Sequence, residues 1–250
     1  MNFSVFIEQN IMKDYVKSAF SREKAHKTQL CMSKSIIFED LLPKKLDLVA
    51  GVDVAYTKNL SIGAVAVLDY DSLKLIESQT TICKTRFPYI PTLLSFREVA
   101  PSVSCIRKLR SQPDVFLVDG HGFAHPYRCG FASHLGLVMR KPTIGVAKSL
   151  LVGEVDKARN KDDFSFLRHE GEVIGAEVVT KKGQKPVYVS VGHMVSLETA
   201  IKIVKHCTRS SRIPEPILKA HEIANNMKQK INIGFGTNRI TSENTLAPEN

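Results

Sequence analysis

Two aspartates in this chain stand in apolar segments of the kind that form buried strands. Asp119 ends the apolar run over residues 115–118 and is followed by Gly120 and Gly122, while Asp53 is the only charged residue in the segment 48–56. A buried carboxylate without a partner is unfavourable, so such a group pairs with a cation or binds a metal ion. A shared divalent cation would account for both acids. The alternative for each is an aspartate that caps a turn or a helix.

A third acid, Glu98, lies in a segment with helical spacing. Apolar side chains recur there at intervals of three or four residues and form one stripe: Phe96, Val99, Val103 and Ile106. This spacing predicts a helix within residues 91–109, with Glu98 at the border of its buried side. The alternative is a solvent-exposed ion pair between Glu98 and Arg97 or Lys108.

Three carboxylates on two strands and a helix favour one group of reactions. Oxygen ligands suit Mg²⁺, with Mn²⁺ as a substitute, better than they suit zinc. Ions held in this way activate water and stabilise the charge of an in-line displacement at phosphorus. Paired carboxylates also hydrolyse glycosides, but that reaction needs neither a third acid nor a basic surface. The acids therefore indicate phosphoryl transfer.

The composition of the chain is basic, with 35 Lys and Arg against 25 Asp and Glu in 250 residues and a formal net charge of +10. This excess favours a polyanionic partner, because neutralised phosphates release condensed counterions. Charge alone does not separate nucleic acid from an anionic membrane surface. The longest apolar run, residues 62–68, is too short to span a membrane, and the N-terminus lacks a signal-peptide core. We therefore expect no membrane association and a cytoplasmic protein, or a nuclear one in a eukaryotic source.

Cysteine and histidine spacing gives no sign of a zinc site. The five cysteines are odd in number and none are spaced as C-x-x-C. His121 and His125 are four residues apart, but Pro126 argues against a continuous helix that would present both.

The order of the predicted elements indicates an α/β fold. Strand-like runs at 47–57, 61–70 and 74–84 suit an antiparallel meander, and the helix around Glu98 leads to a strand ending at Asp119. Further along we expect a helix near 131–140, a strand at 143–147, a hairpin at 173–181 and 186–192, and helices at 196–208 and 215–229. This order predicts a mixed central sheet flanked by helices. We expect residues 1–34 to be a helical extension, 35–230 to be the catalytic domain and 231–250 to be a flexible tail.

Several sequence blocks, in one order from about Leu48 to Asn225, resemble the endonuclease V family, whose fold is ribonuclease H-like. The blocks are Gly51–Val54, Pro88–Pro91 with Phe96–Glu98, Val118–Gly122 with His125, Arg128 and 132–134, then 145–148, 191–193 and 212–216. One such block would be weak evidence, but the ordered set is specific. The chain departs from the family at Tyr127, where many relatives have a basic residue, which leaves Arg128 as the local cation.

The resemblance implies roles for five residues in catalysis. Asp53 and Asp119 would hold the metal ion, Mg²⁺ or Mn²⁺, and Glu98 would complete or flank the site. His221 would stand close by, and Lys148 would steady a phosphate or orient the water. From the residues alone, His221 is as well explained by a hydrogen-bonded core histidine and Lys148 by a solvated amine.

The resemblance also implies a surface that binds the damaged nucleic acid. Tyr89 would enter the duplex as a wedge and fill the gap left when the damaged base swings into a pocket. Held between prolines, this side chain has little conformational entropy to lose, although an ordinary helix entry would explain the segment as well. The residues assigned to nucleic-acid binding are Pro88, Tyr89, Ile90 and Pro91 of the wedge, Gly120, His121 and Gly122 of the pocket, and His125 and Arg128 nearby.

The family's activity would be cleavage of the second phosphodiester bond 3′ to a deaminated adenine (hypoxanthine, the base of inosine), leaving 3′-hydroxyl and 5′-phosphate ends. The expected partner is DNA containing deoxyinosine, bound by a monomer. Three alternatives stay open: an inosine-specific RNA endonuclease, another ribonuclease H-like nuclease such as a junction resolvase, and a non-catalytic reader of modified nucleic acid. The presence of all three acids disfavours the reader.

Overall fold

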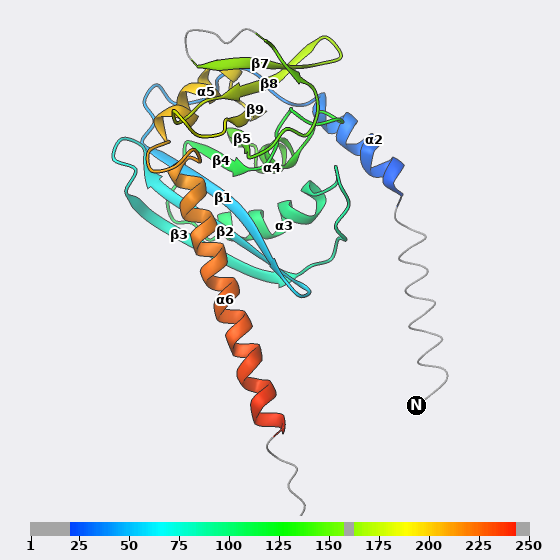
Figure 1. Cartoon of the computed structure of the whole chain (residues 1–250), viewed down its shortest axis with the longest axis vertical. Helices are drawn as coiled ribbons and strands as arrows, with labels where there is room; N and C mark the ends of the chain where they lie inside the picture. Colours follow the sequence, from blue (N-terminus) through cyan, green and yellow to red (C-terminus); the bar gives the residue numbers. More distant parts are fainter. Residues whose placement is uncertain (1–20, 158–162, 244–250) are drawn as a thin grey trace, which may run out of the picture.

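The computed structural model describes residues 21–157 and 163–243, which form a mixed α/β structure (Figure 1). The strands are β1 (Leu48–Thr57), β2 (Leu60–Asp69), β3 (Leu75–Lys84), β4 (Val115–Asp119), β5 (Thr143–Ala147), β6 (Glu154–Val155), β7 (Phe164–His169), β8 (Glu172–Val178) and β9 (Val187–His193). The helices are α2 (Arg22–Ser33), α3 (Ser95–Ile106), α4 (Phe131–Met139), α5 (Leu197–His206) and α6 (Glu215–Glu243). The predicted N-terminal helix is present as α2, and its part before residue 21 lies outside the described residues.

Within these ranges the strands form one sheet in the order β3-β2-β1-β4-β5-β9-β8-β7-β6. β1 pairs antiparallel with β2 along its whole length, from Leu48 opposite Asp69 to Thr57 opposite Leu60, so only positions 58 and 59 form the turn. β1 also pairs in parallel with β4, and β4 with β5. The predicted meander, followed by alternating helix and strand, is confirmed.

Helices cover both faces of this sheet and enclose an apolar core on each side. On one face, Val49 and Leu117 of the sheet share a core with α5 and with Ile217 and Ala220 of α6. On the other face, Val52 and Val118 share a core with Val99 of α3 and Leu135 of α4. Because successive side chains of a strand point to opposite faces, the position of a residue along β1 or β4 decides which helices it meets.

The first turn of α6 lies directly on β1 at Gly51. A Cβ atom on this residue would lie 1.9 Å from the carbonyl oxygen of Pro216 and 2.6 Å from the amide nitrogen of Ile217. Only a residue without a side chain permits so close an approach of two backbones. Gly51 therefore sets the distance between α6 and the strand that carries Asp53.

Two features of the structure differ from the predicted elements. α6 continues to Glu243, past the predicted start of the tail at 231, and the hydroxyl of Thr57 donates to the side-chain oxygen of Asn232 at 2.6 Å. The β1–β2 hairpin thus contacts α6 beyond the residue at which the sequence stops predicting a helix.

Two short strands, β6 and β7, were not predicted from the sequence. β6 has only two residues, and in β7 the apolar residues Phe166 and Leu167 are consecutive, so apolar and polar residues do not alternate there. Among the described helices, α6 included, none combines the length and apolar character of a membrane span.

Replacing Gly51 by Ala is expected to destabilise the protein by about 3 kcal/mol, because the new methyl group would overlap the backbone of α6. The free energy of unfolding, measured by urea denaturation, checks this. Gly171→Ala is the control: Gly171 has a φ of 80° and no atom within 4 Å of the added Cβ, so only the left-handed backbone, worth about 1 kcal/mol, is affected. Equal losses in the two variants would contradict the assigned role of Gly51.

Candidate active site

The register of the sheet brings Asp53 and Asp119 together. Val52 of β1 lies opposite Val118 of β4 in a parallel pair, so the acids one residue further along each strand are neighbours. Both carboxylates lie on the face covered by α6, because Gly51, two residues before Asp53, touches that helix. The pairing of β1 with β4 therefore brings two carboxylates close together in a partly buried site.

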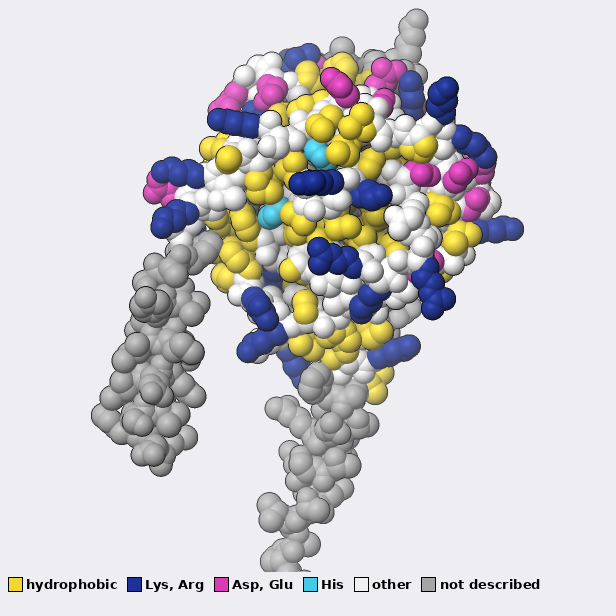
Figure 2. All heavy atoms as spheres, turned by 180° about the vertical axis from the view of Figure 1, so that it is seen from behind, with side chains coloured by type: hydrophobic (Ala, Val, Ile, Leu, Met, Phe, Trp, Pro, Cys, Tyr) yellow, Lys and Arg dark blue, Asp and Glu magenta, His cyan; other side chains and the backbone are white. Residues whose placement is uncertain are grey.

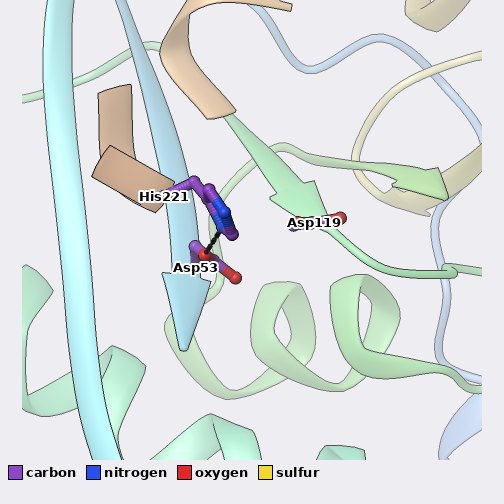
Figure 3. Close-up of side chains that lie close together, drawn as sticks. All are labelled: Asp53, Asp119 and His221. Carbon is purple, nitrogen blue, oxygen red and sulfur yellow. Dashed lines mark hydrogen bonds and ion pairs between the residues drawn. The ribbon is translucent and has the colours of Figure 1, made fainter. Parts of the chain in front are cut away.

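His221 reaches the same place from α6 (Figure 3). Its Nδ1 lies 2.8 Å from Oδ2 of Asp53, and its Nε2 lies 2.9 Å from the amide nitrogen of Asn225, one helical turn further on. Since the amide nitrogen of Asn225 is a donor, Nε2 accepts and Nδ1 carries the proton that is donated to Asp53. Asn225 thereby fixes both the tautomer and the orientation of the ring.

These three residues form the one group of potential metal ligands found among the described residues. One ligand atom each from Asp53, Asp119 and His221 lie within 4.8 Å of one another. Carboxylate oxygens and an imidazole nitrogen at this separation can hold a divalent cation such as Mg²⁺ or Mn²⁺, provided that Nδ1 of His221 releases the proton that it donates to Asp53 in the metal-free arrangement. The donor set thus fits the predicted ion. His221 belongs to this group of potential ligands, and Glu98, which was among the predicted ligands, does not.

Glu98 comes from α3 on the opposite face of the sheet, and it influences the two aspartates through its charge. Burial raises the pKa of the Glu98 carboxyl to about 8, with further contributions from the negative charges of Asp53 and Asp119. Burial also raises the pKa of Asp119, and the charge of Asp53 adds to the effect. Burial and these negative charges therefore make the ionised forms of Asp119 and Glu98 less favourable, a condition that a bound divalent cation would relieve.

Lys148 supplies the cation nearest to Asp119. It follows β5 directly, and its amine donates to Oδ2 of Asp119 at 2.5 Å. Its charge lowers the pKa of Asp119 against the effects of burial and Asp53. The predicted alternative, a merely solvated amine, does not describe Lys148, although its side chain remains 44% exposed and open to another partner.

Two neighbours of the acids were not assigned from the sequence. The guanidinium of Arg97 lies over the ring of Tyr56, 3.8 Å from its centroid, and lowers the pKa of the adjacent Glu98. The second is Asn225, which orients His221. The sequence signal for Asn225 is its spacing of four residues from His221 within one helix, which places both side chains on the same face.

A cavity of about 330 Å³ adjoins the acids. It is lined by Tyr89, Pro91, Thr92, Leu94, Ser95, Glu98, Asp119, Gly120, His121, His125, Gly130, Phe131 and Ser149–Leu151. Tyr89 is 69% exposed at its mouth. Burial lowers the pKa of both His121 and His125 to about 4, so at neutral pH these rings are uncharged hydrogen-bonding groups. The structure thus brings most of the predicted binding residues around one space.

Some predicted binding residues lie outside the lining of this cavity. Gly122 is buried, and its amide donates to the hydroxyl of Ser190, so it supports the fold. The guanidinium of Arg128 donates to Glu172 at 2.7 Å and lies beside His169, so its charge is already balanced. Pro88 and Ile90 belong to the loop that carries Tyr89 but are not part of the lining.

A search for related sequences identifies the family to which this architecture belongs. Residues 31–222 match the model of endonuclease V. An endonuclease V from Thermofilum pendens is 45% identical over 217 residues, which are 84% of this chain and 93% of that protein. The chain belongs to the endonuclease V family. A relative from a Nostoc species, also an endonuclease V, is 44% identical over 82% of this chain and 94% of its own.

Solved structures of endonuclease V share the fold. The enzyme from Streptomyces avermitilis superposes with a TM-score of 0.79 at 32% identity, over 85% of this chain and 95% of its own. A Ciona intestinalis endonuclease V, bound to a 24mer DNA containing an inosine followed by a ribo-adenosine, gives 0.74 at 36% identity, over 82% and 96%. The predicted ribonuclease H-like class and the resemblance to the family are confirmed.

Glu98→Gln is expected to stabilise the metal-free protein at neutral pH by at least about 1 kcal/mol. The pKa of about 8 in the folded state exceeds the value of about 4.3 in an unfolded chain, so the folded state binds more protons between these limits. The free energy of unfolding should therefore fall as the pH rises from 5 to 8 in wild type, and fall less in the variant. Urea denaturation in the presence of a chelator measures both slopes, and parallel slopes would contradict the assignment.

Proposed function

We propose that this protein is a divalent-metal-dependent endonuclease that recognises hypoxanthine in DNA and hydrolyses the second phosphodiester bond 3′ to it. The observation that carries the proposal is the convergence of Asp53, Asp119 and His221 beside a cavity whose mouth carries an exposed Tyr89. Membership of the endonuclease V family supports a nuclease. The Ciona relative, crystallised with inosine-containing DNA, supports the choice of lesion.

Each residue of the centre has a role that follows from its contacts. A divalent ion, when bound, supplies Lewis-acid chemistry that activates water and stabilises charge on the phosphate. Asp53, Asp119 and Glu98 provide the negative charge that holds such an ion, and Asn225 keeps His221 turned towards Asp53. The amine of Lys148, bound to Asp119 and partly exposed, is placed to contact a phosphate oxygen of the strand.

The cavity has the chemistry to accept an extruded base. Extrusion requires less free energy for a poorly paired base than for an intact pair, which favours a mismatched hypoxanthine. His121 contributes a buried Nδ1 that has no hydrogen-bond partner among the described residues, while the backbone of Ser149 engages its ring. A neutral ring that donates from Nε2 leaves Nδ1 as an acceptor, and we propose that the ring turns on binding so that this buried atom meets the ring N–H that hypoxanthine has and adenine lacks.

The charge on the surface supports a polyanionic partner. On the face shown in Figure 2, Lys and Arg side chains occur over the whole surface, whereas Asp and Glu gather along the upper part and the sides, so the middle and lower part carry mostly basic groups among hydrophobic side chains. This distribution suits a strand whose phosphates follow the basic groups while its bases contact apolar surface. We propose that the protein binds as a monomer.

Inosine-containing RNA is the second candidate substrate. The DNA in the complex of the Ciona relative contains an inosine followed by a ribo-adenosine. Phosphate and base contacts resemble each other in DNA and RNA until a 2′-hydroxyl is read. Matched inosine-containing DNA and RNA oligonucleotides, each with and without Mg²⁺, distinguish the two substrates.

Asp119→Asn is expected to abolish cleavage of these oligonucleotides while binding stays within about threefold of wild type, since most of the affinity comes from phosphate contacts. Cleavage is followed on denaturing gels and binding by fluorescence anisotropy. Asp114→Asn is the matched control, because Asp114 accepts from the amides of Asp47 and Leu48 away from the cavity. Full activity in Asp119→Asn, or in excess chelator, would exclude the proposed centre.

Tyr89→Ala is expected to reduce cleavage of inosine in a duplex roughly tenfold, as the loss of one stacked base predicts. The loss should be smaller on single strands, where less stacking is broken to expose the base. The measurement is the ratio of kcat/KM between wild type and variant on paired and unpaired forms of one oligonucleotide. Tyr89→Phe keeps the ring and should retain activity. Equal losses on both forms would mean that Tyr89 only supports the loop.

A further inference from the structure

The helix α2 joins two loops that form opposite parts of the cavity. The amide nitrogen of Gln29 donates to the carbonyls of Thr92 and Cys129, at 2.9 Å each. Thr92 follows the loop that carries Tyr89, and Cys129 follows His125 in the next loop of the site. One side chain therefore ties together two segments that are otherwise far apart in the sequence.

Polar contacts, not an apolar face, attach this helix. Ala25 and Gln29 are its buried residues, and Gln29 is completely buried, with an Oε1 that finds no partner among the described residues. Because both Thr92 and Cys129 present carbonyl oxygens, only the nitrogen end of the amide can face them. A buried side chain with one unsatisfied atom is unfavourable, which points to a purpose other than stability.

His26 adds two contacts one turn earlier on the same helix. Its Nε2 lies 3.1 Å from the hydroxyl of Thr92. Its ring stacks on Tyr127, with centroids 3.8 Å apart and planes 12° from parallel. Most of α2 lies before residue 31, where the match to the family model begins.

The residue that these contacts hold has an unusual backbone. Thr92 has a φ of 70°, a left-handed conformation that β-branched residues rarely adopt. Such a conformation persists only where the surroundings enforce it, and here α2 binds both the carbonyl and the hydroxyl of Thr92. Thr92 lies between the loop of Tyr89 and the helix that carries Glu98, so its φ sets the direction in which the chain leaves that loop.

We propose that α2 is a clamp that presets the position of Tyr89 relative to the cavity, and that Gln29 and His26 are positioning residues for recognition of a paired lesion. The inference rests on the function proposed above for Tyr89 and the cavity. A loop that is already ordered before binding loses less conformational entropy when it enters a duplex. The clamp should therefore matter most where base pairs must be opened.

The test compares Gln29→Met, which keeps the length of the side chain but removes its donors, with Thr28→Met at an exposed position of the same helix. Gln29→Met should lower kcat/KM on paired inosine DNA about tenfold, as expected for lost buried hydrogen bonds, with a smaller loss on the unpaired strand. Amide hydrogen exchange of residues 89–93 in the free protein should become faster. Thr28→Met should change neither quantity.

Unchanged exchange in residues 89–93, or equal losses on paired and unpaired strands, would overturn the clamp. The exchange measurement needs no substrate, so it judges the clamp even if wild type fails to cleave inosine, an outcome that would overturn the proposed function instead. If Gln29→Met does not fold, His26→Phe carries the same test. That variant keeps the stack on Tyr127, removes the contact with the Thr92 hydroxyl and should show the same selective loss to a smaller degree.

Discussion

Repulsion between carboxylates in a partly buried space is the constraint on which the rest of this structure depends. The charge of Asp53 raises the pKa of both Asp119 and Glu98, and the charge of Asp119 adds to the effect on Glu98. Lys148 and His221 offset part of this repulsion, and the remainder must be balanced by packing elsewhere in the fold. The two apolar cores, one on each face of the sheet, supply that balance. The architecture therefore favours binding of a cation at the expense of stability without one.

Much of the fold and of the centre could be predicted because the deciding signals are local. The apolar runs around Asp53 and before Asp119 identify β1 and β4, and carboxylates within such runs indicate a site at their meeting point. Alternation along a strand could also have placed both acids on the face of α6 and Glu98 on the other. The prediction gave the metal ion to Asp53 and Asp119 and left Glu98 to complete or flank the site, but it did not state that Glu98 would approach from the other face of the sheet.

The remaining features depend on contacts between residues far apart in the sequence. The contact between Thr57 and Asn232 lies beyond the predicted end of the helix and joins α6 to β1, 175 residues earlier in the sequence. Arg128 was expected to meet a phosphate, but Glu172, 44 residues later, occupies its guanidinium. The two bonds of Gln29 span 63 and 100 residues. Neither composition nor periodicity around these positions carries a signal for such pairings.

β1 pairs with a strand on each side, and this limits where residues can be inserted into the chain or deleted from it. β1 is paired residue by residue with β2 through a two-residue turn and is simultaneously in register with β4. A slip of one residue would turn Asp53 to the opposite face of the sheet, and realigning β1 with one neighbour would misalign it with the other. We therefore expect insertions and deletions to be tolerated better in the loops outside this hairpin than between Leu48 and Asp69. Between these residues, the spacing of the chain is itself part of the catalytic centre.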